Sequence, residues 1–188
     1  MRFLPGLICL LPLLSPLAHA ELIDDINDRG ELRIALEANT APFNFKEDGK
    51  LTGFEVELGE MLANELDVRA DFVVTDAEDL LAGVETGKYD VAINHIALTP
   101  ELADRFDTST PYSQPDAQLL ASKDESQRPL VMAQSFQAQE KKGPPPSLVI
   151  PFQKDNPAFK ASLDNALARI KEDGRLEQLS QKWLKQPE

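Results

Sequence analysis

The sequence predicts an α/β domain built on a largely parallel sheet. Two short segments, 32–36 and 68–74, alternate their apolar side chains as half-buried strands do. The stretches 54–66 and 80–84 repeat apolar residues at helical spacing. Strands and helices that alternate at these lengths favour parallel strands joined by helical crossovers. We therefore expect an α/β lobe with helices flanking the sheet and C-terminal helices packed back on it.

Local signals place the other elements. Asp76 is a good helix N-cap, Gly87 is a natural helix end, and Asn156 and Pro157 suit the start of a helix. In chain order we expect a helix over 24–29, a strand over 32–36, a hairpin or loop over 41–49, a helix over 54–66, a strand over 68–74, a helix over 76–87, a strand over 89–98, a short strand over 148–150, and helices over 156–174 and 176–183.

Composition marks two segments that lie outside the predicted lobe. Residues 1–20 have a basic start at Arg2, a mostly apolar stretch and a small-residue site at 18–20, which predicts a cleaved secretory signal. Residues 124–146 are rich in Lys, Gln, Ser and Pro and end in Gly-Pro-Pro-Pro, which predicts a polyproline-like connector. The expected lobe is thus 21–123 plus 147–188 of an exported protein.

Composition excludes several kinds of site. Beyond the signal there is no cysteine, which excludes disulfides and thiolate metal sites, and His95 is the sole histidine. We therefore expect no metal, no cofactor and no triad chemistry. Without Arg2, 18 basic residues stand against 32 acidic ones, a formal charge of −14 that disfavours nucleic acid and anionic lipid as partners.

Several ordered motifs resemble a known family. They are Ala-Pro-Phe-Asn-Phe at 41–45, Gly-Lys-Leu-Thr-Gly-Phe at 49–54, Gly-Lys-Tyr-Asp-Val at 87–91, Leu-Thr-Pro-Glu at 98–101, Ser-Thr-Pro-Tyr at 109–112 and Lys-Trp at 182–183. Together they resemble the first lobe of family 3 periplasmic solute-binding proteins, the amino-acid receptors of ABC importers. The resemblance covers about 21–123 and 147–184. It implies a type II periplasmic-binding-protein fold and a periplasmic location.

The chain departs from that family in two ways. The family inserts a whole second lobe where this chain has only the connector 124–146, and a domain needs at least about 50 residues. The family also places an arginine that clasps the ligand α-carboxylate where this chain has Leu102, and aromatic residues where it has Thr40 and Ala77. We therefore expect a single lobe whose amino-acid site is degenerate.

Candidate ligand contacts follow the strand ends, where open α/β sheets bind ligands. Glu37, Asn39, Asn94 and His95 are the candidate polar contacts, with Phe43 as an apolar wall. Each has a structural alternative. His95 and Asn94 could bond neighbouring backbone, Glu37 could be a solvated carboxylate, and Phe43 could belong to the core.

A second candidate site is apolar. Without a second lobe, Phe43, Ile96, Leu98 and Leu102 are expected to line an uncovered patch, a feature typical of partner surfaces. The connector could instead cover it. The acidic clusters 55–60 and 76–79 are most simply solvated helix faces.

Two functions fit these observations. The first is a non-enzymatic periplasmic protein of the amino-acid ABC transporter receptor type with a degenerate solute site. The alternative is a periplasmic accessory module for protein interaction that has lost solute binding. Candidate partners are a small polar solute, an ABC importer or other periplasmic protein, and a second copy across the open cleft face. No acid–base pair for enzyme chemistry stands out.

Overall fold

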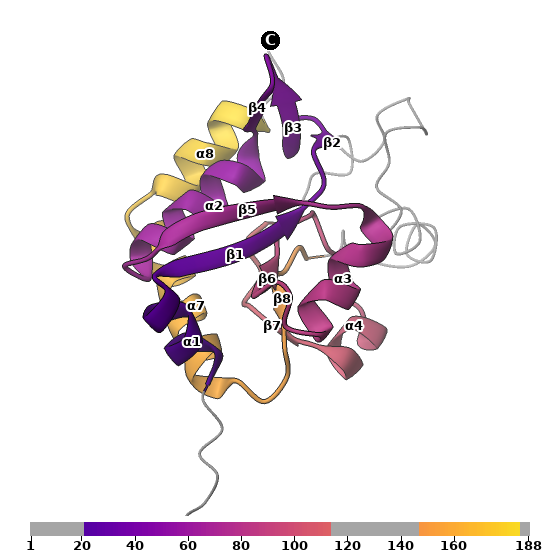
Figure 1. The fold of residues 1–188 in the computed structure, drawn as a ribbon. Coiled ribbons are helices and arrows are strands. Elements are labelled where there is room, and N and C mark those ends of the chain that lie inside the picture. The colour runs from indigo at the N-terminus through magenta and orange to yellow at the C-terminus, as the bar shows by residue number, and fades with distance from the viewer. Residues whose placement is uncertain (1–20, 114–146, 185–188) are drawn as a thin grey trace, which may run out of the picture.

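The structure is a computed structural model that describes residues 21–113 and 147–184 (Figure 1). The predicted signal at 1–20 and the predicted connector at 124–146 lie outside these residues and stay predictions. Six helices and eight strands are described, and they form a compact α/β arrangement with two sheets.

The main sheet is mixed rather than largely parallel. Its five strands run in the order β5 (Arg69–Val74), β1 (Glu31–Leu36), β6 (Val91–Ala92), β8 (Pro151–Phe152) and β7 (Asp107–Thr108). The first three are parallel, with Glu31 beside Arg69 and Ile34 beside Val91. The last two join antiparallel. The crossover from β1 to β5 through a helix is as expected. The two antiparallel strands, β8 and β7, lie outside the segments that the sequence predicts as strands.

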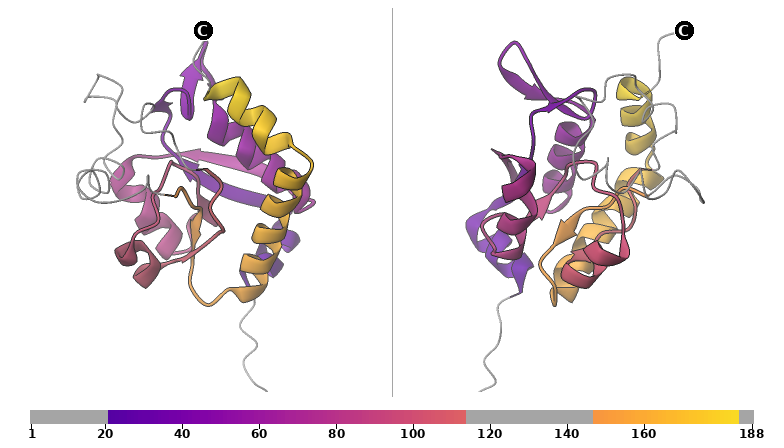
Figure 2. Two further views of the ribbon diagram at one scale, coloured as in Figure 1. Left: turned by 180° about the vertical axis from the view of Figure 1, so that it is seen from behind. Right: turned by 90° about the vertical axis from the view of Figure 1, so that its right-hand side faces the viewer.

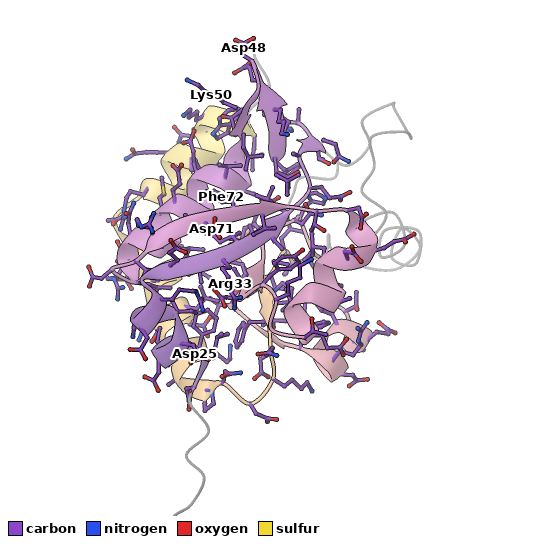
Figure 3. The ribbon with its side chains drawn as sticks, viewed as in Figure 1. Asp25, Arg33, Asp48, Lys50, Asp71 and Phe72 are labelled. Carbon is purple, nitrogen blue, oxygen red and sulfur yellow. The ribbon has the colours of Figure 1, made fainter. Side chains whose placement is uncertain are left out.

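A small antiparallel sheet rises from the carboxyl end of β1. It consists of β2 (Asn39–Thr40), β3 (Asn44–Glu47) and β4 (Lys50–Thr52), and it projects from the body (Figure 2, right). Its tip carries Asp48 and Gly49, both with positive φ, as the tight hairpin turn requires (Figure 3).

Helices cover both faces of the main sheet, and the strand alternation sorts the core into two clusters. Leu32 and Ile34 of β1 pack with α1 (Leu22–Arg29), α2 (Phe54–Glu65), α7 (Pro157–Glu172) and α8 (Arg175–Trp183). Ala35, the residue after Ile34, points to the other face and packs with α3 (Ala77–Glu85) and α4 (Pro100–Arg105). In Figure 2 (left), α7 and α8 follow one another along one side of the molecule.

The element predictions were confirmed for most helices and strands but not at two places. The strand expected over 89–98 is regular only at Val91–Ala92, because the chain turns at His95, whose φ is 41°. The strand expected over 148–150 lies at Pro151–Phe152 instead, preceded by an isolated bridge at Leu148. The Asp76 cap is confirmed, since its side chain accepts the Asp79 N–H at 3.0 Å.

The start of α7 is stabilised differently from the prediction. Asn156 precedes Pro157 as expected, but its side chain makes no cap bond to the helix. Its amide oxygen instead accepts the Leu22 N–H at 2.8 Å, and the Glu21 carboxylate accepts the Ala158 N–H at the same distance. The two helix starts are therefore tied to each other.

The C-terminal helices pack back on the lobe, as predicted. Leu176 and Leu179 of α8 are buried in the main core. At the outer edge, Glu65 of α2 pairs with Arg169 and Arg175, and these two cations hold the pKa of the Glu65 carboxyl below its ordinary value of 4.5. This network ties α2 to α7 and α8.

The amino ends of the parallel strands are held by a buried acid. Asp90 is fully buried and accepts hydrogen bonds from Arg29 at 2.5 Å and from Arg33 at 2.6 Å, and also from the Arg33 backbone N–H at 2.7 Å. A buried carboxylate needs such partners because burial removes its water. The Asp90 side chain thereby fixes β6 against β1 at their start.

We predict that Asp90→Ala lowers the free energy of unfolding by about 3 kcal/mol, because it removes these bonds and leaves the Arg33 N–H without its acceptor. Both arginines are about 30% exposed, so the loss should fall at the low end for a buried pair. Urea unfolding measures it. Asp104→Ala, at an exposed position of α4, is the control and should change stability by less than about 0.5 kcal/mol. Equal effects for both variants would contradict the assignment.

The described residues on either side of the range 114–146 lie next to each other in the structure. Leu148 donates its N–H to Ser113 O at 2.8 Å and accepts the Tyr112 N–H at 3.0 Å. The described residues on the two sides of the range 114–146 are therefore paired with each other.

We predict that deleting residues 124–146 and joining 123 to 147 leaves a folded lobe, because the paired ends at Ser113 and Leu148 remain. Shortening the loop should add at most about 1 kcal/mol of stability by loop-closure entropy. Far-ultraviolet circular dichroism and a urea titration measure this. Loss of cooperative unfolding would contradict the prediction that this segment is a connector.

Candidate functional site

Polar side chains gather where the parallel strands end. Glu37 follows β1 directly, and Asn94 and His95 follow β6 after one further residue. Asn39 lies at the start of the small sheet, beside the same edge. The sequence-predicted polar residues are thus at the expected end of the sheet, the usual place for a ligand in an open α/β sheet.

Glu55 is the centre of this region, and it is fully buried in the first turn of α2. Its carboxylate accepts hydrogen bonds from the Asn44 amide at 2.6 Å, from the Tyr112 hydroxyl at 2.6 Å and from the His95 backbone N–H. The His95 ring nitrogen Nδ1 lies 3.4 Å from Glu55 Oε2. No lysine or arginine among the described residues pairs with this carboxylate. Its hydrogen-bonding capacity is therefore met by uncharged donors.

A row of hydrogen bonds runs from Glu55 to the sheet edge. The Asn44 amide group that bonds Glu55 also donates to Asn94 Oδ1 at 3.0 Å. Asn94 Oδ1 accepts the Glu37 backbone N–H at 3.0 Å, and Asn94 Nδ2 donates to Glu37 Oε2 at 3.0 Å. We call Glu55, Asn44, Asn94 and Glu37 the amide relay. It joins a buried acid to a partly exposed one.

His95 and Phe43 belong to the core rather than to an open site. Both side chains are buried, and their ring centroids lie 5.4 Å apart. Phe43 also packs edge-on against Phe54. The two His95 ring nitrogens are buried without a hydrogen-bond partner. The buried positions of Phe43 and His95 therefore do not support the expectation that Phe43 forms a ligand wall or that the His95 ring contacts solute. The His95 ring lies inside because the chain turns at this residue.

The expected apolar patch is also corrected. Phe43, Ile96 and Leu102 are 5%, 0% and 7% exposed, and only Leu98 is open at 42%. The chain doubles back through α4, so Ile96 and Leu102 pack with Phe106 in the second core cluster. The core thus extends past the sheet edge and takes up the side chains expected on the surface.

Leu102 stands inside a short capped helix. The Thr99 side chain accepts the Leu102 N–H at 3.1 Å, which orients the first turn of α4. Arg105, the next candidate cation, pairs with Glu85 at 2.6 Å on the surface. Neither position supplies a guanidinium to the carboxyl edge of the sheet.

The charge at this edge has one sign. The segments that form it, 37–41, 74–78 and 94–102, carry the acids Glu37, Asp76, Glu78 and Glu101 and no lysine or arginine. Asn39 is exposed, and its amide oxygen accepts the Thr40 hydroxyl at 2.8 Å. The edge therefore favours a cation over an anion.

Sequence reasoning missed Asn44, Glu55 and Tyr112. The expectation that the acidic cluster 55–60 is solvated is wrong for Glu55, although Glu60 is exposed as expected. The available signal was the helix face, because Gly59 and Leu62, four and seven residues on, are buried with it. A lone acid on that face requires donors from elsewhere in the fold.

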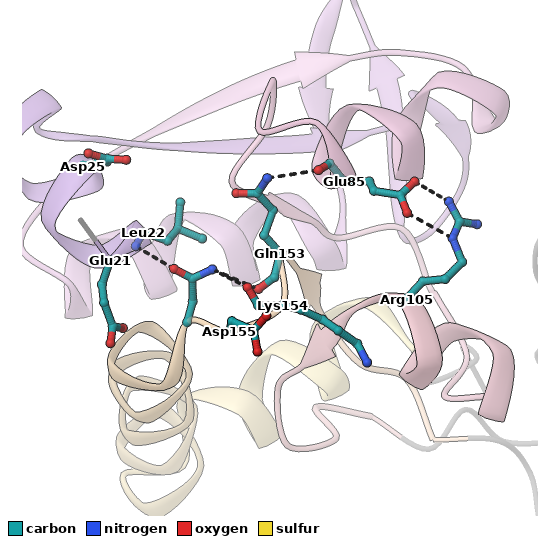
Figure 4. A pocket seen from close by; sticks show the side chains of 9 residues that line it. Glu21, Leu22, Asp25, Glu85, Arg105, Gln153, Lys154 and Asp155 are labelled. Atoms are coloured by element: carbon teal, nitrogen blue, oxygen red, sulfur yellow. Dashed lines mark hydrogen bonds and ion pairs between the residues drawn. The ribbon is translucent and has the colours of Figure 1, made fainter. Parts of the chain in front are cut away.

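A pocket of about 480 Å³ lies at the other end of the sheet (Figure 4). Its walls come from the start of α1, the ends of α3 and α4 and the turn after β8, and they include the Glu85–Arg105 pair. Its charged groups are of both signs, and those of Arg105 and Glu85 already bond each other. It lies apart from the amide relay, and none of the sequence-predicted site residues lines it.

Two features are absent from residues 21–113 and 147–184. These residues contain no group of three or more His, Cys, Asp or Glu placed to hold a metal ion. None of the described helices combines the length and apolar character needed to cross a membrane.

We predict that the two tyrosines of the chain ionise far apart. The Lys88 ammonium and a bond to Thr75 lower the pKa of Tyr89 below 10.0, whereas burial and the neighbouring Glu55 charge raise the pKa of Tyr112 well above it. Tyrosinate absorbance should show one tyrosine ionising before pH 10 and the second only on unfolding.

The same shift makes stability depend on pH. Unfolded Tyr112 ionises near its ordinary pKa of about 10, so its contribution is complete below that pH and is lost as the pH rises further. Tyr112→Phe should remove this alkaline fall in the free energy of unfolding. A variant with the same alkaline fall would contradict the buried position of the hydroxyl.

The chain is similar in sequence to known solute-binding proteins. Residues 32–186 match the sequence profile of the bacterial extracellular solute-binding proteins, family 3. The L-cystine-binding protein TcyJ of Escherichia coli K12 is 39% identical over 107 residues, which span 56% of this chain and 40% of TcyJ. The chain thus matches less than half the length of this relative.

Solved structures share the fold. The ancestral amino acid-binding protein AncCDT-1, a precursor of cyclohexadienyl dehydratase, superposes with a TM-score of 0.69 at 25% identity, covering 88% of this chain and 100% of that one. A mutant of domain 1 from TmArgBP in its arginine-bound form gives 0.61 at 24% identity, covering 80% and 98%. With a profile match over most of its length, the chain belongs to the bacterial extracellular solute-binding proteins of family 3.

Proposed function

We propose that this chain is a non-enzymatic periplasmic solute-binding lobe that binds a small cationic solute at the carboxyl edge of its sheet, without a clasp for an α-carboxylate. Glu37 and Asn39 are the contacts in this proposal, and Asn94 orients Glu37. Handing the solute to an ABC importer would be its role in the cell. The resemblance to amino-acid receptors of such importers motivates that last step.

The observation that carries the proposal is the place of Leu102. The family resemblance implies an arginine there, whose planar guanidinium binds a carboxylate with two hydrogen bonds. Here the side chain is aliphatic and packs in the second core cluster. With no lysine or arginine in the segments 37–41, 74–78 and 94–102, these segments offer an α-carboxylate no charged partner.

Glu37 supplies the attraction for a cation. One carboxylate oxygen, Oε2, accepts the Asn94 amide, and the side chain is partly exposed. An ammonium or guanidinium group that bonds the other oxygen would form a charge-assisted hydrogen bond. Affinity should be low, since one open lobe buries less of a solute than a closed pocket does.

Relatives support a solute rather than a macromolecule as the ligand. TcyJ is named for binding L-cystine, and domain 1 from TmArgBP has a structure in the arginine-bound form. The latter is a single domain that this chain matches over 98% of its length. A single domain of this fold in an arginine-bound form makes solute binding by one lobe a reasonable expectation.

The test compares two amines, one with and one without a carboxylate, and adds a dicarboxylate that has no amine. We predict that cadaverine, which is lysine without its carboxylate, binds the purified protein at least as tightly as L-lysine, and that glutarate does not bind. Isothermal calorimetry or a thermal-shift titration into the millimolar range measures this, since a ligand of the folded state raises the melting temperature. Glu37→Gln should weaken cadaverine binding about tenfold by loss of the charge-assisted bond.

Asp48→Asn is the matched control. It removes the same charge at the exposed hairpin tip, where asparagine also tolerates the positive φ (Figure 3). It should leave cadaverine affinity unchanged. Much tighter binding of L-lysine than of cadaverine would contradict the loss of the carboxylate clasp. Equal losses for the two variants would mean that only overall charge attracts the amine.

A second candidate function is the accessory interaction module. Val74 and Leu98 are the large apolar side chains that stand exposed among the described residues, at 48% and 42%. Val74 ends β5, and Leu98 lies beyond the end of β6, so both belong to the carboxyl end of the sheet. A protein that binds none of the solutes, yet self-associates in sedimentation until Leu98→Asn or Val74→Asn is introduced, would favour this function and the homodimer.

A further inference from the structure

We infer that Glu55 is a positioning residue for solute binding: from inside the core it fixes the direction of the Asn44 amide, which together with the Glu37 backbone N–H holds the Asn94 side chain that orients the Glu37 carboxylate at the sheet edge. This inference rests on the proposed function, in which Glu37 contacts the solute. It assigns a role to a buried side chain that the sequence reasoning had placed on the surface.

The first step is the chemistry of the carboxylate. An ionised carboxyl group only accepts hydrogen bonds, and three donors converge on its two oxygens. The donors come from β3, from the turn after β6 and from the segment that precedes residue 114. The Asn44 side chain must therefore present its NH₂ group to Glu55.

The second step is the state of Asn44. Its NH₂ group lies between two acceptors, Glu55 Oε2 at 2.6 Å and Asn94 Oδ1 at 3.0 Å. Its own amide oxygen is buried without a partner. An unpaired buried carbonyl is unfavourable, but turning the amide would point this oxygen at two acceptors. The acceptor-only Glu55 therefore holds the NH₂ group in its present direction.

The third step carries the direction to the edge. Asn94 Oδ1 faces inward because it accepts two hydrogen bonds there, from the Asn44 amide and from the Glu37 N–H. The Asn94 NH₂ group is then left to donate to Glu37 Oε2 at 3.0 Å. One Glu37 oxygen is thereby held, and the carboxylate has a defined orientation at the edge.

Glu55 also fixes the turn that carries Asn94. His95, the next residue, has a φ of 41°, in the left-handed region that a β-carbon disfavours. Its backbone N–H points to Glu55 Oε1. This bond offsets the unfavourable backbone conformation, so the same carboxylate holds both the side chain and the backbone of the site.

Glu55→Gln is the informative change, because glutamine has nearly the same shape but one oxygen becomes a donor. If the new NH₂ group faces Asn44, the Asn44 amide must turn to accept it, and its oxygen then faces Asn94 Oδ1. Asn94 thereby loses the Asn44 donor and keeps only the Glu37 N–H. If the new NH₂ group faces the other way, the His95 N–H loses its acceptor. No orientation of glutamine satisfies all three donors.

The experiment reads the relay directly by ¹H–¹⁵N nuclear magnetic resonance on the purified protein. In Glu55→Gln we expect shifts in the side-chain amide signals of Asn44 and Asn94 with the Glu37 backbone amide, or in the His95 backbone amide. Glu60→Gln, an exposed position on the same helix, is the matched control and should move none of them. A folded Glu55→Gln variant with all these signals unchanged would overturn the inference.

Solute affinity gives the functional readout. Cadaverine affinity should fall about tenfold in Glu55→Gln, as in Glu37→Gln, and the double variant should lose little more, because both changes affect one contact. Full additivity of the two losses would overturn the inference. Absence of cadaverine binding in the wild type would overturn the proposed function alone, since the amide signals still test the relay.

A second variant covers the case in which Glu55→Gln does not fold. Asn44→Ala removes the link between Glu55 and Asn94 but keeps the acid with its other donors. The Glu37 backbone amide and the Asn94 side-chain amide should shift, and the His95 backbone amide should not. An unchanged Glu37 signal in this variant would overturn the inference.

Discussion

A carboxylate buried without lysine or arginine beside it must be satisfied by hydrogen-bond donors, and this constraint organises the candidate site. Among the described residues, Glu55 takes its donors from Asn44, His95 and Tyr112, which lie on three separate segments. A donor or acceptor left here without a hydrogen-bond partner would cost about 1–3 kcal/mol, and a charged group would cost more. The small sheet, the turn after β6 and the segment at Tyr112 are therefore held to α2 by one side chain.

Asp90, the other buried acid among the described residues, has charged rather than neutral hydrogen-bond partners. It sits at the amino ends of the parallel strands and bonds two arginines, so its charge is compensated by charges that reach solvent. Glu55, at their carboxyl ends, bonds neutral donors, and two of these, the Asn44 amide and the Tyr112 hydroxyl, can also present an acceptor. The first arrangement gives a rigid base to the lobe. The second transmits an orientation, because an amide has a donor side and an acceptor side whereas a guanidinium only donates.

The sequence predicted the fold better than the site, for a physical reason. Alternation and helical spacing report which face of an element is buried, and they located β1, β5 and α2 closely. The sequence predicted correctly that Asn94 lies at the carboxyl end of a strand, because its position after the strand along the chain is enough to determine this. The role of Glu55 depends on donors 11, 40 and 57 residues away, which no local pattern records. Ile96 and Leu102 were misplaced because the return of the chain through α4 adds a second layer of core.

The burial of Leu102 bears on how this lobe can be related to amino-acid receptors. Its side chain packs with Ile96 and Phe106, and its N–H is bonded by Thr99. An arginine at this position would place a guanidinium in an apolar cluster unless α4 moved, and burying an unpaired charge is strongly unfavourable. Substitution of this one residue therefore cannot restore a carboxylate clasp on the present backbone. Selectivity is left to the acidic edge, where the orientation of Glu37 depends on Asn94 and, behind it, on the buried carboxylate of Glu55.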